Sequence, residues 1–202
     1  MFTGIVEELG VVRAIRHREG GARIEIAAST VIADAQVGDS IAVNGCCVTV
    51  VELGDGWWAA DAVIETLERT ALGALEVDEP VNLERPLHLS DHLGGHLVQG
   101  HVDAVGRVAA RDALADGSTR FTFSAPRQVL RYVVEKGSVA VDGISLTVAA
   151  LGDGTFDVAA IPHTLAVTTL RHKGVGAAVN LETDLVAKYV ERLLTPISRE
   201  GI

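Results

Sequence analysis

The chain has 202 residues, of which 48% are hydrophobic and 4% aromatic, and its formal net charge is −10 at pH 7. A hydrophobic share of this size supports packed globular domains and excludes a disordered chain. The acidic balance argues against binding to nucleic acid or to anionic membranes, because both require a basic face.

Short segments rich in β-branched residues recur along the chain, with Gly, Asp and Asn between them. Such segments favour strands joined by tight turns. Because no β-α-β alternation is present, antiparallel barrels are favoured over a doubly wound sheet. The main strands expected are, in chain order, 21–26, 40–51, 57–62, 140–149 and 155–160. Short helices are expected at about Thr30–Ala35 and Arg127–Val134, each just before a glycine.

A glycine-containing polar segment at 87–96 suits a linker between two domains. We therefore predict domains over 1–97 and 98–184, followed by a terminal segment, 185–202. In that segment apolar residues follow helical spacing from Leu185 to Leu194, with Thr183 or Asp184 as the cap and an end near Pro196. The single apolar face of this helix needs a partner, either its own barrel or other copies of the chain.

The chain contains one pattern twice. The segment 44–50, Asn-Gly-Cys-Cys-Val-Thr-Val, returns 98 positions later at 142–148 as Asp-Gly-Ile-Ser-Leu-Thr-Val. The opening segment 4–7 matches 100–103 at an offset of 96. A period near 98 is too long for a solenoid unit of about 20–50 residues and fits a whole small domain. We therefore predict an internal duplication that yields two domains of one fold.

Each repeat carries small polar side chains on one face of a strand. Because side chains in a strand alternate between its faces, Cys47 and Thr49 share a face, and so do Ser145 and Thr147 in the second copy. Together with the glycine two residues before each pair, they could form a shallow floor for a flat polar ligand. Ordinary polar residues at a strand end are the alternative, which the presence of the pattern in both copies disfavours.

The two copies differ in reactive groups. The second copy has Asp142, Ser145 and Lys136 where the first has Asn44, Cys47 and Gly38. A carboxylate, a hydroxyl and an ammonium close to one strand could bind a polar substrate and move protons. A plain ion pair between Asp142 and Lys136 at a turn is the alternative. His101 adds a group that titrates near neutral pH.

The cysteines and histidines do not indicate a metal site. Cys46 and Cys47 are neighbours, a disulfide between them would be strained, and neither belongs to a CxxC pattern. His88, His92 and His96 are spaced by four, but Gly94-Gly95 within that span argues against a helix that would align them. We expect no metal and reduced thiols. The sequence also has no apolar run of about 18 residues and no export signal, so we expect a cytoplasmic protein.

Four motifs together resemble the riboflavin synthase family of the α-chain type. They are Met1–Glu8, 44–49, Gly94-Gly95-His96-Leu97 with Gly100-His101-Val102, and 142–147, and the likeness extends from Met1 through the terminal helix. The resemblance implies an all-β fold of two tandem six-stranded Greek-key β-barrels with a C-terminal α-helix. It also implies a homotrimer held by these helices, and association with lumazine synthase.

The resemblance further implies a reaction without a cofactor. Two molecules of 6,7-dimethyl-8-ribityllumazine dismutate by transfer of a four-carbon unit, giving riboflavin and 5-amino-6-ribitylamino-pyrimidinedione. The active site of the family forms where the first barrel of one subunit meets the second barrel of another. The alternative is a non-catalytic lumazine or flavin carrier of the lumazine-protein type, in which we expect the reactive groups of the repeats to be lost.

The family's binding positions fall on two sets of residues. The first site is expected to contain Gly4, Ile5, Val6, Cys47, Val48, Thr49, Asp61, Ala62, Val63, Ile64, Glu65 and Thr66. The second is expected to contain Gly100, His101, Val102, Lys136, Ser145, Leu146, Thr147, Ile161, Pro162, His163, Thr164, Leu165 and Ala166.

Roles within these sites are hypotheses. Phe2 resembles an aromatic cover over a bound ring. Ser145 with Asp142, and His101, are candidates for proton transfer at the 7-methyl group, while Cys47 and Thr49 would orient the partner lumazine. Asp184 could reach the site or only cap the terminal helix.

Overall fold

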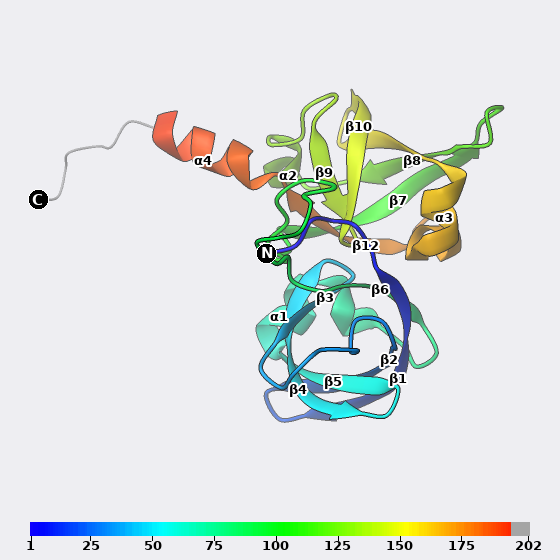
Figure 1. The fold of residues 1–202 in the computed structure, drawn as a ribbon. Coiled ribbons are helices and arrows are strands. Elements are labelled where there is room, and N and C mark those ends of the chain that lie inside the picture. Colours follow the sequence, from blue (N-terminus) through cyan, green and yellow to red (C-terminus); the bar gives the residue numbers. More distant parts are fainter. Residues whose placement is uncertain (195–202) are drawn as a thin grey trace, which may run out of the picture.

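The protein forms two closed antiparallel β-barrels, which Figure 1 shows one above the other. The structure is a computed structural model and describes residues 1–194. In the first barrel the strands are ordered β1-β2-β5-β4-β3-β6, the non-consecutive order of a Greek key. Its elements are β1 Glu8–Arg18, β2 Gly21–Ala27, β3 Ser40–Val43, β4 Cys46–Gly54, β5 Trp57–Val63, helix α1 Ile64–Arg69, the 3-10 helix η1 Ala71–Ala74 and β6 Pro80–Glu84.

The second barrel repeats this topology strand for strand. Its closed order, β10-β11-β8-β7-β12-β9, is the order of the first barrel with each strand replaced by its counterpart. The predicted duplication of an all-β fold is therefore confirmed. The elements are β7 Ala104–Ala113, β8 Thr119–Ser124, helix α2 Arg127–Leu130, β9 Ser138–Val141, β10 Ile144–Gly152, β11 Thr155–Ala160, helix α3 Pro162–Val167, the 3-10 helix η2 Thr169–His172 and β12 Ala178–Thr183.

Two expected strands are in fact hairpins. The segment 40–51 turns at Asn44-Gly45, where both residues have positive φ (44° and 73°), and this turn separates β3 from β4. The segment 140–149 turns in the same way at Asp142-Gly143 (46° and 76°). Positive φ at both central residues defines the tight hairpin turn that Asn-Gly and Asp-Gly favour. Asn-Gly and Asp-Gly indicate these turns in the sequence, but the apolar residues on both sides of each pair favoured one continuous strand.

The predicted short helices are only partly present. Residues 30–35 form turns instead of a helix, and α2 covers only the first half of Arg127–Val134. The carboxylate of Glu8 receives the backbone N–H groups of Ser29, Thr30 and Val31, so a strand side chain holds the 29–31 segment as a turn. Such side-chain bonds offer the backbone an alternative to helix.

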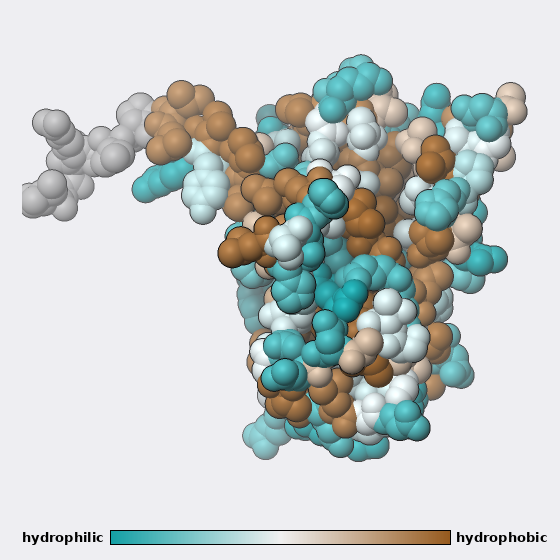
Figure 2. All heavy atoms as spheres, viewed as in Figure 1, coloured by the Kyte–Doolittle hydropathy of each residue, from teal (hydrophilic) through white to brown (hydrophobic). Residues whose placement is uncertain are grey.

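The terminal helix α4, Leu185–Leu194, projects from the second barrel (Figure 1). Asp184 caps it, because its Oδ1 accepts the backbone N–H of Val186 at 2.9 Å. Lys188 pairs with Asp103 of the second barrel at 2.7 Å, and Glu191 contacts Arg131 and Tyr132. Even so, most of its nonpolar side chains remain exposed: Val186, Tyr189, Val190, Leu193 and Leu194. Figure 2 shows brown, hydrophobic residues along this projecting helix. The predicted end near Pro196 lies outside the described residues.

Each barrel has its own apolar core. Trp58 is fully buried in the first, whereas the second is built around the three buried rings of Phe121, Phe123 and Phe156. Full burial of such a ring stabilises the fold by about 1.5–3 kcal/mol. On β4 the side chains alternate as expected, with Cys46 in the core and Thr49 exposed, and β10 follows the same pattern. The outward faces of these two strands are therefore free to meet a ligand.

The two barrels meet around an approximate twofold relation. Gly45 and Gly143 lie back to back, and a Cβ on either would come within 3 Å of the other's Cα. Across this contact Asn82 Nδ2 donates to the carbonyl of Asp142, while Asn180 Nδ2 donates to the carbonyl of Asn44, both at 2.8 Å. The sequence Val-Asn-Leu-Glu, which occurs at 81–84 and again at 179–182, thus supplies one asparagine from each barrel to hold the other barrel's hairpin.

Candidate active site

The segment preceding each barrel crosses over to the other barrel. Gly4 O accepts the backbone N–H of Ser145 at 2.7 Å, and Gly100 O accepts that of Cys47 at 2.8 Å. Val6 packs against the second core and Val102 against the first. The predicted grouping was therefore wrong in this respect, because Gly4-Ile5-Val6 lies beside β10 and Gly100-His101-Val102 beside β4. We call the surface formed by the outward face of β10 and Gly4-Ile5-Val6 the second cradle. The surface formed by the outward face of β4 and Gly100-His101-Val102 is the first cradle.

Two buried glutamates hold the crossing segments in place. Glu84 receives the N–H and hydroxyl of Thr3 at 2.6 and 2.7 Å and the N–H of Gly4 at 3.0 Å. Glu182 receives the N–H groups of Gln99, Gly100 and His101 at 2.6 to 2.9 Å. Burial raises the pKa of both carboxyl groups, and these backbone donors oppose the rise. The glutamates were visible in the sequence as a repeated motif, but their task depends on contacts some 80 residues away.

Ser145 and His96 form a hydrogen-bonded pair in the second cradle. The Ser145 Oγ lies 2.7 Å from His96 Nδ1. His96 is 8% exposed, and burial lowers its pKa, while the charge of Asp184 acts in the opposite direction. A lowered pKa keeps the imidazole neutral near pH 7, so that one ring nitrogen can accept a proton. The sequence indicated His96 only as the third of three spaced histidines and as part of the motif Gly94-Gly95-His96-Leu97, so its contact with Ser145 was not predicted.

Gly95 makes this approach of His96 to Ser145 sterically feasible. A Cβ at position 95 would lie 2.7 Å from the Ser145 Cβ and 2.9 Å from its Oγ, and would also collide with the carbonyl oxygen of Thr3. Glycine is therefore required where the linker passes over β10.

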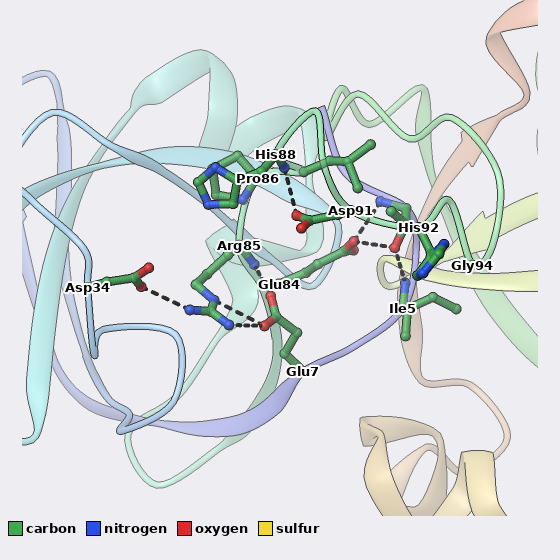
Figure 3. A pocket seen from close by; sticks show the side chains of 12 residues that line it. Ile5, Glu7, Asp34, Glu84, Arg85, Pro86, His88, Asp91, His92 and Gly94 are labelled. Atoms are coloured by element: carbon green, nitrogen blue, oxygen red, sulfur yellow. Dashed lines mark hydrogen bonds and ion pairs between the residues drawn. The ribbon is translucent and has the colours of Figure 1, made fainter.

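His88 and His92 do not join His96. They line a separate hollow of about 400 Å³ beside Arg85, which is paired with Glu7 and Asp34 (Figure 3). Ile5 and Gly94 also line this hollow. Within residues 1–194 no three His, Cys, Asp or Glu side chains gather in a way that could hold a metal ion.

Asp142 does not face a cradle, which contradicts its predicted part in proton transfer. It has no exposed surface, its Oδ1 accepts the N–H of Asn180 at 2.7 Å, and its Oδ2 lies 3.4 Å from the Nζ of Lys173. Lys136, the partner in the alternative ion pair, is exposed and precedes β9. The carboxylate turned inward because the Asp142-Gly143 turn packs against the other barrel.

Phe2 is also placed differently from the expectation. Its side chain is fully buried between the barrels, in a cluster with Ala42, Val98 and Ala140, and its backbone pairs with Val98. A ring without exposed surface does not cover a ligand. It instead fixes the start of the chain against the segment that leads to the first cradle.

The first cradle contains a thiol, a hydroxyl and an imidazole in place of the hydrogen-bonded Ser145–His96 pair of the second cradle. Cys47 is half-buried and Thr49 exposed, with His101 exposed next to them on the crossing segment. Burial raises the pKa of the neighbouring Cys46 thiol to about 12, so this group remains protonated. Asp61 is held by Arg18 and Arg23 at 2.8 and 3.0 Å, and these contacts lower its pKa.

The remaining predicted binding residues divide by burial. Val48, Ala62 and Leu146 point into the cores, so they shape the cradles without exposing their side chains. The exposed or partly exposed ones lie where β5 leads into α1 and where β11 leads into α3: Val63, Ile64, Glu65 and Thr66 in the first barrel, and Ile161, Pro162, His163, Thr164, Leu165 and Ala166 in the second.

Two like barrels with unlike cradles, each completed by a segment that crosses over, define a duplicated small-molecule-binding protein. A family model described as "Lumazine binding domain" matches residues 3–86 and again residues 99–184. Among curated proteins, the riboflavin synthase of Mycobacterium bovis is 52% identical over 96% of this chain and 98% of its own length. That of Actinobacillus pleuropneumoniae is 44% identical over 96% and 90%. The chain belongs to the riboflavin synthase family, with two lumazine-binding domains.

Solved structures show the same fold at lower sequence identity. LumP in complex with riboflavin matches with a TM-score of 0.84 at 23% identity, over 91% of this chain and 99% of that one. LumP has also been crystallised with 6,7-dimethyl-8-(1'-D-ribityl) lumazine, and that structure matches with a TM-score of 0.82. At this identity the likeness concerns the fold alone.

Proposed function

We propose that the protein acts as a riboflavin synthase, a transferase that dismutates two molecules of 6,7-dimethyl-8-ribityllumazine. One molecule gives a four-carbon unit to the other, and riboflavin and 5-amino-6-ribitylamino-pyrimidinedione result. The observation that carries the proposal is the pair of cradles, equal in fold and unequal in reactive groups. A reaction between two copies of one molecule needs two such sites, one for the donor and one for the acceptor.

The second cradle carries the stronger proton-transfer groups. Ser145 Oγ is held by His96 Nδ1, whose lowered pKa suits a general base. In our proposal Ser145 Oγ takes a proton from the 7-methyl group as its own hydroxyl proton passes to His96, and Asp184 stabilises the imidazolium. The first cradle, with Cys47, Thr49 and His101, orients the second lumazine.

A subunit interface would bring the two substrates together. The exposed apolar side chains of α4 support a homotrimer in which the first barrel of one subunit faces the second barrel of another. Association with lumazine synthase and a cytoplasmic location remain predictions. No helix within residues 1–194 has both the length and the apolar character needed to cross a membrane.

Turnover of the lumazine in a metal-free buffer tests the proposed activity. We expect riboflavin to form when the purified protein is incubated with 6,7-dimethyl-8-ribityllumazine, followed by absorbance and fluorescence. Tight binding without product would favour the non-catalytic carrier. No binding in a fluorescence titration would exclude both functions.

A methyl group at Gly95 tests the close contact above Ser145. We expect Gly95→Ala to lower kcat by about tenfold or more, because the new Cβ displaces Ser145 from His96. Gly94→Ala is the matched control, since its Cβ would meet only the flexible side chain of Ile5, at 3.2 Å. Equal activities of the two variants would contradict this account of the cradle.

A further inference from the structure

The buried ion pair between Asp142 and Lys173 has no counterpart in the first barrel. At the same offset of 98 positions the first barrel has Asn44 and Leu75, a neutral amide and an apolar side chain. Asn44 is 2% exposed and Leu75 8%, and Leu75 belongs to the first core. At equivalent positions of the two barrels, the second therefore has a charged pair of residues and the first a neutral pair.

The charge is not needed for the hydrogen bonds of the turn. Asn44 Oδ1 accepts the N–H of Asn82 at 2.8 Å, just as Asp142 Oδ1 accepts that of Asn180 at 2.7 Å. The backbone N–H of each turn residue also donates to the carbonyl of the same asparagine, at 2.9 and 2.8 Å. The first barrel thus forms the same turn with an amide. The carboxylate of the second barrel calls for a separate reason.

Burial of this pair is unfavourable by itself. Asp142 has no exposed surface and the Lys173 side chain is 13% exposed, so both charges have lost most of their water. The desolvation of two buried charges can exceed their attraction, and such a pair is therefore weak evidence for stability. What a buried pair can contribute is a fixed geometry, because each charge is costly in any other position.

The pair connects three parts of the second barrel. Asp142 lies in the turn that leads into β10, three residues before Ser145. Lys173 directly follows η2, and its Nζ also donates to the carbonyl of Ala178 at 3.0 Å, where β12 begins. The unit formed by α3 and η2 carries the exposed residues 161–166 of the second cradle. The Lys173 ammonium thus links the turn that leads into β10 with the start of β12, directly after η2.

We propose that Asp142 and Lys173 are positioning residues that fix the Ser145 hairpin relative to the α3–η2 wall of the second cradle. The first cradle, which in our proposal only orients a lumazine, has the neutral Asn44 and the apolar Leu75 at these two positions, and an apolar side chain supplies no directional bond. The second cradle holds the proton-transfer pair and needs a directional one. This inference rests on the proposed function, because it assigns the pair a role in that reaction.

The first barrel supplies the variant that tests this proposal. Asp142→Asn alone leaves the Lys173 ammonium without its counter-charge, and Lys173→Leu alone leaves the buried Asp142 carboxylate without its counter-charge. Each single variant should lower the Tm by roughly 10 °C. The double variant recreates the pair Asn44 and Leu75, so its Tm should return to within about 3 °C of the wild type.

The decisive readout is the division between kcat and KM in the double variant. We expect kcat to remain about tenfold below the wild type, with KM changed less than about threefold, because Ser145 is misplaced while the binding surface persists. Arg16→Leu, which removes the ion pair of the exposed Arg16 with Glu25 in the first barrel, is the control and should leave kcat unchanged.

Each other outcome overturns the positioning role. A double variant with wild-type kcat would make the charged pair equivalent to the neutral one. A rise in KM alone would make the pair part of the binding surface. A double variant that melts no higher than the single variants would show that the two positions are not matched. Wild-type turnover is measured first, since absence of riboflavin there would overturn the proposed function instead.

Discussion

Replacing Ser145 by alanine lowers kcat by about 100-fold or more, the contribution expected of a group that takes part in proton transfer. Its Oγ has a neutral, buried histidine at 2.7 Å, an arrangement that matters when a proton moves and less when the substrate only binds. KM should therefore change little. Steady-state kinetics with the lumazine as the only substrate measures both constants.

Ser124→Ala is the matched control for this experiment. Its hydroxyl lies in the same barrel, where it donates to the carbonyl of Arg107 at 3.4 Å. We expect this variant to retain wild-type kinetics. A large rise in the KM of Ser145→Ala with unchanged kcat would instead identify Ser145 as a binding residue. Unchanged kinetics would remove it from the mechanism.

Deleting the chain from Leu185 onward should yield monomers with at least tenfold lower activity, because the second lumazine would no longer be held opposite the first. The apolar side chains of α4 are exposed in the single chain, with Leu193 and Leu194 at 83% and 77%. Burial of such side chains between subunits is a strong driving force for association. Light scattering after size-exclusion chromatography measures the mass, and the riboflavin assay measures turnover.

Point variants separate the apolar face from the rest of the helix. Leu193→Glu with Leu194→Glu keeps the ion pair of Lys188 with Asp103 and the Asp184 cap of α4, yet should also give monomers. Arg192→Gln changes a polar residue of the same turn and should preserve the assembly. A truncated monomer with full activity would refute an active site shared between subunits.

Much of the local architecture could be predicted from the sequence. The alternation along β4 and β10 follows from the pleat of a strand, so the outward faces of Cys47, Thr49, Ser145 and Thr147 were predictable. The helix α4 was predictable from its spacing and cap. The two hairpin turns are indicated by Asn44-Gly45 and Asp142-Gly143, but the apolar residues on both sides of each pair led to the prediction of one long strand.

The composition of the candidate site was harder to predict. The repeat showed that Gly4 and Gly100 play equivalent parts, but not which barrel each one serves. Their hydrogen bonds reach Ser145 and Cys47, which are far away in the sequence, and two similar barrels offer two equally plausible partners. For the same reason His96 was read as part of a histidine series, whereas its contact with Ser145 depends on the path of the linker over Gly95.

The sequence by itself determined that this protein is a duplicated all-β chain with two cradles of unequal chemistry, because strand alternation and turn preference act between near neighbours. Only the tertiary structure decided which groups face those cradles. It turned Asp142 inward to Lys173, buried Phe2 between the barrels and brought His96 to Ser145. These outcomes depend on how the two barrels pack against each other. A charge buried at that contact loses its hydration and needs a partner, and its neighbours in the sequence do not determine which partner it meets.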